Sequence, residues 1–124
     1  DIDVRSFSIL ELNRIDKAVK SLTSDVAGVE VTGGINRPPL ETESTKDLYV
    51  KIEKVAKDLG LPEVGSASVG GASDGNFAAA AGAKVLDGLG AIGSGAHALT
   101  ESIVISSVEP RIKLTTAFIN ELLK

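Results

Sequence analysis

A glycine-rich stretch from Val69 to His97 holds most of the residues that could do chemistry, including the single histidine of the chain. Most of the 13 glycines also lie there. Glycine costs backbone entropy and adds nothing to a core, so this density indicates a backbone shaped to approach a ligand. Tight turns in an α/β domain explain the same density, and composition alone leaves both interpretations open.

The segment 88–93 has the spacing G-x-G-x-x-G. In a dinucleotide-binding fold, such glycines let a pyrophosphate reach the N-terminus of a helix that follows directly. A strand with an acidic end should then come about 20 residues later. Here further glycines and His97 follow instead, and we therefore reject a dinucleotide site.

The segment 71–75 has the spacing G-x-S-x-G of a nucleophile elbow, with Ser73 at its centre. Asp87 and His97 follow in the Ser-Asp-His order of the α/β-hydrolases. However, all three residues fall within one short stretch, whereas that order normally places the acid and the base on separate, later strands of a large sheet. A serine hydrolase using Ser73, Asp87 and His97 is therefore an alternative hypothesis.

His97 also suggests metal binding, because a neutral imidazole is a common metal ligand. A zinc site needs several protein ligands, and no companion ligands accompany His97 apart from the nearby Glu101. From the residues alone, His97 is part of a metal-site hypothesis, and a packed or surface histidine is the alternative.

The composition excludes several classes of function. The net charge is -4, there is no basic run, and the aromatic residues are three phenylalanines and one tyrosine, so nucleic-acid binding is disfavoured. No apolar run approaches the roughly 18 to 20 residues of a membrane span, and no secretory leader is visible. The absence of cysteine excludes disulfides and thiol catalysis but leaves the compartment open, with the cytoplasm favoured. The absence of methionine suggests a chain cut from something longer.

The first 35 residues predict a β-α-β unit. Residues 1–7 alternate apolar and polar side chains, as in a half-buried strand. Ser8 and Glu11 have the spacing of a capping box, and a helix should run from there to about Leu22. Residues 29–31 alternate again before two glycines and predict a second strand. Two prolines then break the pattern, and we place a domain boundary there.

The remaining sequence predicts three helices and short strands. The longest helix should begin at Ser44 and end at Gly60. Ser73 should cap a helix to about residue 81, and Ser107 should cap the final one. We expect strands at 67–69, 83–86 and 101–106.

The motifs taken in order resemble the C-terminal part of the di-zinc exopeptidase family. They are Gly70–Asn76, Val85–Gly90 and Ala96–Glu101. The family includes glutamate carboxypeptidases, succinyl-diaminopimelate desuccinylase, acetylornithine deacetylase and aminoacylases, and the glutamate-carboxypeptidase-like branch is the most similar. Residues 1–5 resemble a strand of the family's lid domain, and residues 36–39 its return to the catalytic domain.

The resemblance implies an α/β fold. Residues 1–35 would be the second half of a ferredoxin-like lid, or dimerisation, domain. Residues 36–124 would be the C-terminal part of the catalytic domain. Because only half of the lid sheet is present, we expect an unpaired strand edge that invites self-association, and a homodimer in the intact protein.

The resemblance also implies hydrolysis of an amide bond next to a free carboxylate, in a peptide or an N-acyl amino acid. Two zinc ions and a glutamate base perform this reaction in the family. By position, His97 resembles the ligand of the second zinc. Arg5 resembles the arginine that pairs with the substrate carboxylate, although a surface pair with Asp3 is the alternative. The remaining residues with implied substrate contacts are Gly71, Ala72, Ser73, Asn36 and Arg37.

The sequence departs from the family pattern in one important respect. The His-x-Asp motif, the bridging aspartate, the paired glutamates and a further acidic ligand of the family are all absent. We therefore predict that this chain has no peptidase activity by itself and that the general base lies upstream. A non-catalytic interaction or structural domain is the alternative from a different class.

Overall fold

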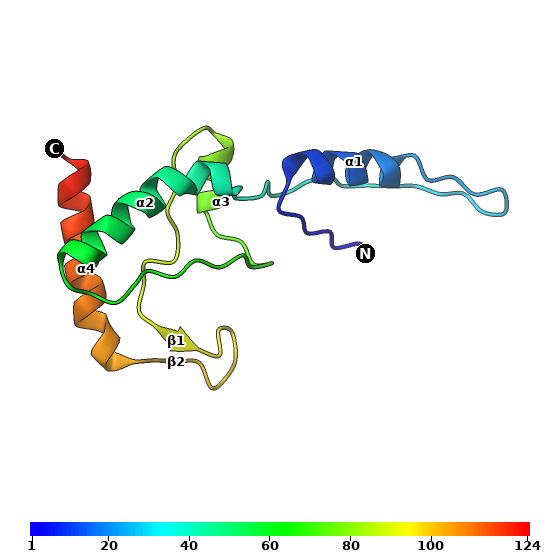
Figure 1. Ribbon diagram of the computed structural model, residues 1–124. Coiled ribbons are helices and arrows are strands. Elements are labelled where there is room, and N and C mark those ends of the chain that lie inside the picture. Colours follow the sequence, from blue (N-terminus) through cyan, green and yellow to red (C-terminus); the bar gives the residue numbers. More distant parts are fainter. The chain divides into compact units, whose positions relative to one another are not determined.

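The computed structural model describes residues 1–124 and contains four α-helices, one 3-10 helix and a two-stranded sheet (Figure 1). The chain divides into two compact units. Unit 1 consists of Asp1–Thr45 and Ser68–Val85, and unit 2 of Lys46–Ala67 and Leu86–Lys124. The mixture of helices with a small sheet is compatible with the expected α/β class.

Helix α1, Ile9–Lys20, begins where the sequence predicts, but the predicted capping box is wrong. Ser8 is the N-cap residue and its side chain makes no capping hydrogen bond. The backbone N–H of Ile9 instead donates to Oε1 of Glu41 at 2.8 Å. Glu11 binds the guanidinium of Arg14. A carboxylate is a stronger acceptor than a hydroxyl. The carboxylates of Glu41 and Glu11 therefore bind partners outside the predicted capping box, namely the Ile9 N–H and Arg14.

The strands predicted at 1–7 and 29–31 do not form, so the predicted β-α-β unit is wrong. Both segments lack ladder hydrogen bonds, and their apolar side chains Ile2 and Val29 are exposed. The strands predicted at 67–69 and 83–86 are also absent. A strand needs a neighbour to complete its hydrogen bonds, and the alternation of one segment does not provide that neighbour.

Helix α2, Thr42–Asp58, is the longest helix and begins two residues before the predicted Ser44. Gly60, two residues after the last helical residue, terminates it with a φ of +65°. The N–H of Gly60 donates to the carbonyl of Lys57, and the N–H of Leu61 donates to that of Ala56. This pair of hydrogen bonds is a Schellman motif, which the left-handed glycine permits. The predicted end of the helix is confirmed.

The core of unit 2 lies between α2 and the final helix α4, Val108–Leu122. It contains buried residues from both helices, which cross near the C-terminal end of α2 (Figure 1): Ile52, Ala56, Leu114 and Phe118. Partly buried apolar side chains extend this core, among them Leu48, Val55 and Leu61. Apolar side chains of the two helices therefore meet there and are removed from water.

The only sheet pairs β1, Gly93–Ser94, with β2, Ser102–Ile103, in antiparallel register. Gly93 is opposite Ile103, and Ser94 is opposite Ser102. The strand predicted at 101–106 is thus confirmed only at its second and third residues, and the 3-10 helix η1, Ile105–Ser107, follows. No helix of the structure combines the length and the apolar character that crossing a membrane requires.

Candidate functional site

Arg5 contacts the segment that carries the predicted substrate loop. Its Nη1 donates a hydrogen bond of 3.0 Å to the carbonyl oxygen of Gly70, 65 residues further along the chain. Gly70 directly precedes the predicted contact residues Gly71, Ala72 and Ser73. Unit 1 therefore brings together two groups of residues that the sequence assigns to substrate binding.

The opposite edge of the Arg5 guanidinium is occupied by Asp3. Nε and Nη2 donate to the same carboxylate oxygen, Oδ2, at 3.1 and 2.9 Å. This is the surface pair that the sequence offered as the alternative. The side chains of Arg5 and Asp3 are 65% and 73% exposed, so water screens their attraction. The pair therefore contributes little to stability.

The predicted substrate loop leads into helix α3, Gly75–Ala80. Asp74 is the N-cap residue, but the Ser73 hydroxyl accepts the N–H of Gly75 at 3.1 Å and so caps the first turn. The N–H of Ser73 donates to Oδ1 of Asn76 at 3.0 Å. Ser73 is therefore held by its own helix.

The N–H groups of Gly71 and Ala72 have no hydrogen-bond partner in the structure, and both residues are exposed. These two consecutive N–H groups are free to donate hydrogen bonds to an oxygen of a ligand. In this loop the backbone N–H groups of Gly71 and Ala72 are therefore free, whereas the N–H of Ser73 is already bonded to Asn76.

Residues 36–38 attach to the same segment through Asn76, which is 8% exposed. Its Nδ2 donates to the carbonyl of Pro38 at 2.8 Å. The Arg37 guanidinium lies over the ring of Phe77, 5.0 Å from the ring centroid, as in a cation–π contact. Asn36 is exposed and makes no hydrogen bond. Arg5 and Arg37 are therefore both attached to residues 70–77.

His97 lies in unit 2, in the loop that joins β1 to β2. It has a φ of +68° and is the only residue other than glycine with a positive φ. Turn hydrogen bonds flank it, from Ala98 N–H to the Gly95 carbonyl and from Glu101 N–H to the Ala98 carbonyl. The side chain is exposed, so it is presented to solvent or to a ligand.

The chain alone does not fit a zinc site. The structure contains no group of three or more His, Cys, Asp or Glu side chains that could hold a metal ion. Structural and catalytic zinc sites use at least about three protein ligands. His97 is therefore one donor without the companions that a complete site requires.

The serine-hydrolase alternative lacks the pairing that it needs. Oδ1 of Asp87 accepts the N–H of the adjacent Gly88 at 2.8 Å, and no hydrogen bond joins Asp87 to His97. In a catalytic triad the acid must orient the imidazole. The G-x-G-x-x-G segment leads into β1 and not into a helix, so it also lacks the geometry of a dinucleotide site.

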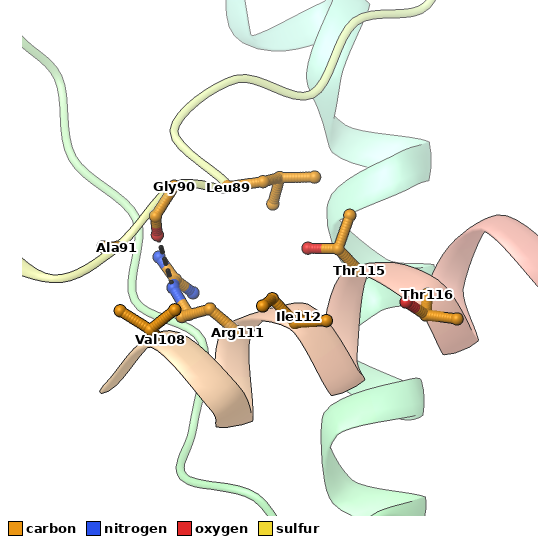
Figure 2. A pocket seen from close by; sticks show the side chains of 8 residues that line it. All are labelled: Leu89, Gly90, Ala91, Val108, Arg111, Ile112, Thr115 and Thr116. Carbon is orange, nitrogen blue, oxygen red and sulfur yellow. Dashed lines mark hydrogen bonds between the residues drawn. The ribbon is translucent and has the colours of Figure 1, made fainter. Parts of the chain in front are cut away.

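Two small hollows lie in unit 2, and neither is lined by a predicted site residue. The first, about 270 Å³, lies between residues 89–91 and the first turns of α4 (Figure 2). The second, about 440 Å³, lies at the C-terminal end of α2 and includes Lys57 and Leu61.

Asn76 and Arg111 organise the structure although no sequence motif singles them out. Asn76 appeared only as part of a motif; its side chain holds the nearby Ser73 N–H and also the carbonyl of Pro38, 38 residues earlier in the sequence. Arg111 donates to carbonyls of the glycine-rich loop, and carbonyl acceptors leave no signature in side-chain types. The only sequence feature that could have indicated Arg111 is its position in the first turns of the last helix.

The model of Peptidase family M20/M25/M40 matches residues 6–121. The match covers nearly the whole chain, so the chain belongs to this family of peptidases, which are generally metal-dependent hydrolases. The family resemblance drawn from the sequence motifs is therefore confirmed. Neither the comparison with curated proteins nor that with solved structures yields a match.

Proposed function

We propose that this chain supplies substrate-binding residues and one metal ligand to a zinc-dependent exopeptidase or amidohydrolase. The enzyme would cleave an amide bond next to a free carboxylate, in a peptide or an N-acyl amino acid. The observation that carries the proposal is the contact between the Arg5 guanidinium and the Gly70 carbonyl, beside the unpaired N–H groups of Gly71 and Ala72. Membership of a metallopeptidase family supports it.

In this proposal, each group of residues has its own part. Arg5 pairs with the substrate carboxylate, for which a planar guanidinium offers two parallel donors. The N–H groups of Gly71 and Ala72, with the Ser73 hydroxyl, line the pocket for the rest of the substrate. Asn36 and Arg37 add polar contacts from the neighbouring segment. His97 supplies an imidazole nitrogen to the metal, and its exposed, left-handed position in a loop is compatible with that part.

The domain assignment is a proposal as well. Residues 1–35 would belong to the lid, or dimerisation, domain and residues 36–124 to the catalytic domain. The two compact units are assembled from different segments of the chain and do not test this boundary. In the intact protein we propose a homodimer and a cytoplasmic location.

We propose that the chain alone is inactive. The general base and the other metal ligands would come from residues outside this sequence. The absence of any group of three or more potential ligands supports this. We derive no catalytic step through zinc from these residues, because they do not form a site for it.

The first experiment is native mass spectrometry of the protein as isolated, which reports the subunit mass and the bound metal together. The proposal expects a subunit heavier than 12.7 kDa that carries zinc and hydrolyses N-acyl amino acids. His97→Ala should lower the zinc content and the activity, and a chelator should abolish the activity. Arg5→Ala should raise KM about tenfold or more for substrates with a free carboxylate, but not for their amides.

Two results would contradict the proposal. Activity that survives a chelator and His97→Ala but is lost in Ser73→Ala would establish a serine hydrolase. A subunit heavier than 12.7 kDa with no metal and no hydrolase activity would indicate an interaction or structural domain. Arg14→Ala is a suitable control for Arg5→Ala, because Arg14 is also an exposed arginine paired with an acidic neighbour.

A further inference from the structure

The base of the loop that carries His97 is held by a side chain from the final helix. Nε of Arg111 donates to the Gly90 carbonyl at 2.9 Å (Figure 2), and Nη2 donates to the Gly88 carbonyl at 3.2 Å. These carbonyls lie 21 and 23 residues before Arg111 in the sequence. A single guanidinium therefore fixes two points of the segment that enters β1.

A second side chain from the same end of α4 joins the two sides of this hairpin. The Ser107 hydroxyl donates to the Val104 carbonyl at 2.6 Å and accepts the N–H of Ile92 at 3.1 Å. The N–H of Val104 also donates to the Ile92 carbonyl at 2.8 Å. Ser107 is 8% exposed, so these hydrogen bonds are protected from competing water.

The hairpin has little other means of holding its shape. Each of its strands is two residues long, and an isolated two-stranded hairpin is marginal in water. Four glycines between residues 88 and 95 add backbone freedom that ordering must overcome. Ile103 is exposed, so apolar burial contributes little at this position.

We propose that Arg111 and Ser107 are positioning residues for His97: they fix the base of the hairpin and so the place of its imidazole. This inference rests on the proposed function, because the position of the imidazole matters at the active site only if His97 binds the metal. The fork of an arginine is required, since its separate N–H groups reach two carbonyls at once. A lysine ammonium is a point charge and does not reproduce this arrangement.

The test is amide hydrogen exchange, followed by NMR, on the full 124-residue chain. We expect Arg111→Gln and Ser107→Ala each to accelerate exchange at Val104 about tenfold, and at Ala98 and Glu101 in the same direction. Exchange in the core, at Ile52 and Phe118, should stay unchanged. Lys113→Gln is the matched control, because it removes a positive charge from the same helix without touching the hairpin.

The imidazole of His97 provides a second readout that general loss of stability does not produce. Its ring signals should shift or broaden in Arg111→Gln and in Arg111→Lys, while signals from α1 keep their positions. Unchanged exchange at Val104 together with unchanged His97 signals would overturn the proposal. So would equal acceleration in the hairpin and the core, because Arg111 and Ser107 would then act on the whole unit.

These outcomes are separate from those of the proposed function. The metal content of His97→Ala tests whether His97 is a ligand, and hairpin exchange tests what holds the hairpin. A loosened hairpin with normal metal content in His97→Ala would leave the hydrogen-bond anchor standing and remove the proposed ligand. Unchanged hairpin exchange in Arg111→Gln and Ser107→Ala, together with loss of metal in His97→Ala, would support His97 as a ligand and remove the hydrogen-bond anchor.

Discussion

Nη1 of Arg5 and the carbonyl oxygen of Gly70 lie 3.0 Å apart, which joins two segments separated by 65 residues. The guanidinium is mostly exposed, so this bond adds little stability. It does place a planar cation beside backbone N–H groups that have no partner. The contact is therefore weak in energy but specific in position, which is compatible with the proposed role of Arg5 in substrate binding.

Asp3 competes for the same guanidinium, so Asp3→Asn should strengthen substrate binding. The Nε and Nη2 edge of Arg5 would be released for the substrate carboxylate. Since an exposed pair is worth up to about 1 kcal/mol, we expect KM for a carboxylate-bearing substrate to fall by up to about fivefold. Steady-state kinetics on the active protein measures this. Asp16→Asn, which breaks the exposed pair with Lys20, is the control. An unchanged or higher KM would show that Arg5 does not bind the substrate carboxylate.

Ile52→Ala should destabilise unit 2. Ile52 is fully buried in the core formed by α2 and α4, and truncating such a side chain costs about 2–5 kcal/mol. Val50, on the same helix, is 64% exposed, so Val50→Ala should change stability by less than about 0.5 kcal/mol. Urea unfolding followed by circular dichroism compares the two variants. Equal effects would mean that the packing of α2 against α4 is wrong.

Gly93→Ala should open the hairpin. A Cβ at Gly93 would collide with the backbone carbonyl oxygen of Ser102, the residue before its cross-strand partner Ile103, and backbone cannot move aside cheaply. Gly90→Ala is the control, because a Cβ there meets nothing within 4 Å. We expect faster amide exchange at Val104 in Gly93→Ala only, by about tenfold. The same exchange rate in both variants would contradict the observed register of β1 and β2.

Acidification should weaken α1 through Glu11. Hydrogen bonds from Arg14 lower the pKa of the Glu11 carboxyl from its usual value, and the charge of Arg14 adds to this effect. The folded-state pKa is thus below the unfolded one, so the pair stabilises the helix above the ordinary glutamate pKa. This contribution is lost as the pH falls through the lowered value.

The measurement is the thermal midpoint of helical circular dichroism across a series of acidic pH values. In Glu11→Gln the thermal midpoint should fall less steeply as the pH is lowered, because this carboxylate is no longer there to be protonated. Glu30→Gln, at an exposed position outside any helix, should leave the decline as it is in the unmodified chain. The pairing of Glu11 with Arg14 has no role in stability if all three chains show the same pH dependence.

The helices could be predicted from the sequence because their signals are local. Apolar residues recur at helical spacing along α2 and α4, but in α4 only Leu114 and Phe118 are buried, whereas Ile112, Ile119 and Leu122 are exposed. The left-handed Gly60 marks the end of α2 where the sequence predicts it. The strands could not be predicted in the same way. Their alternation describes one segment, whereas a ladder depends on a partner elsewhere in the chain. Of the residues predicted to be in strands, only Ser102 and Ile103 pair with another strand.

The candidate site shows the same division between local and distant information. Residue types and their order identified the family, and with it the interest of Arg5 and His97. The sequence gives no sign that Arg5 bonds to Gly70, that Glu41 caps α1, or that Arg111 holds the glycine loop. In the Arg5 and Arg111 bonds the acceptor is a backbone carbonyl, which every residue possesses. Such contacts are fixed by the fold and become visible only with it.

The two units are interleaved along the chain, and this has a consequence for synthesis. Unit 1 needs residues 68–85 to join residues 1–45, and unit 2 needs residues 86–124 to join residues 46–67. On a ribosome, α1 is therefore complete before residues 68–85, which belong to the same unit, have been made. Ile52 likewise emerges well before its packing partner Phe118. Nascent chains of this arrangement expose apolar surface for longer than sequentially built domains do.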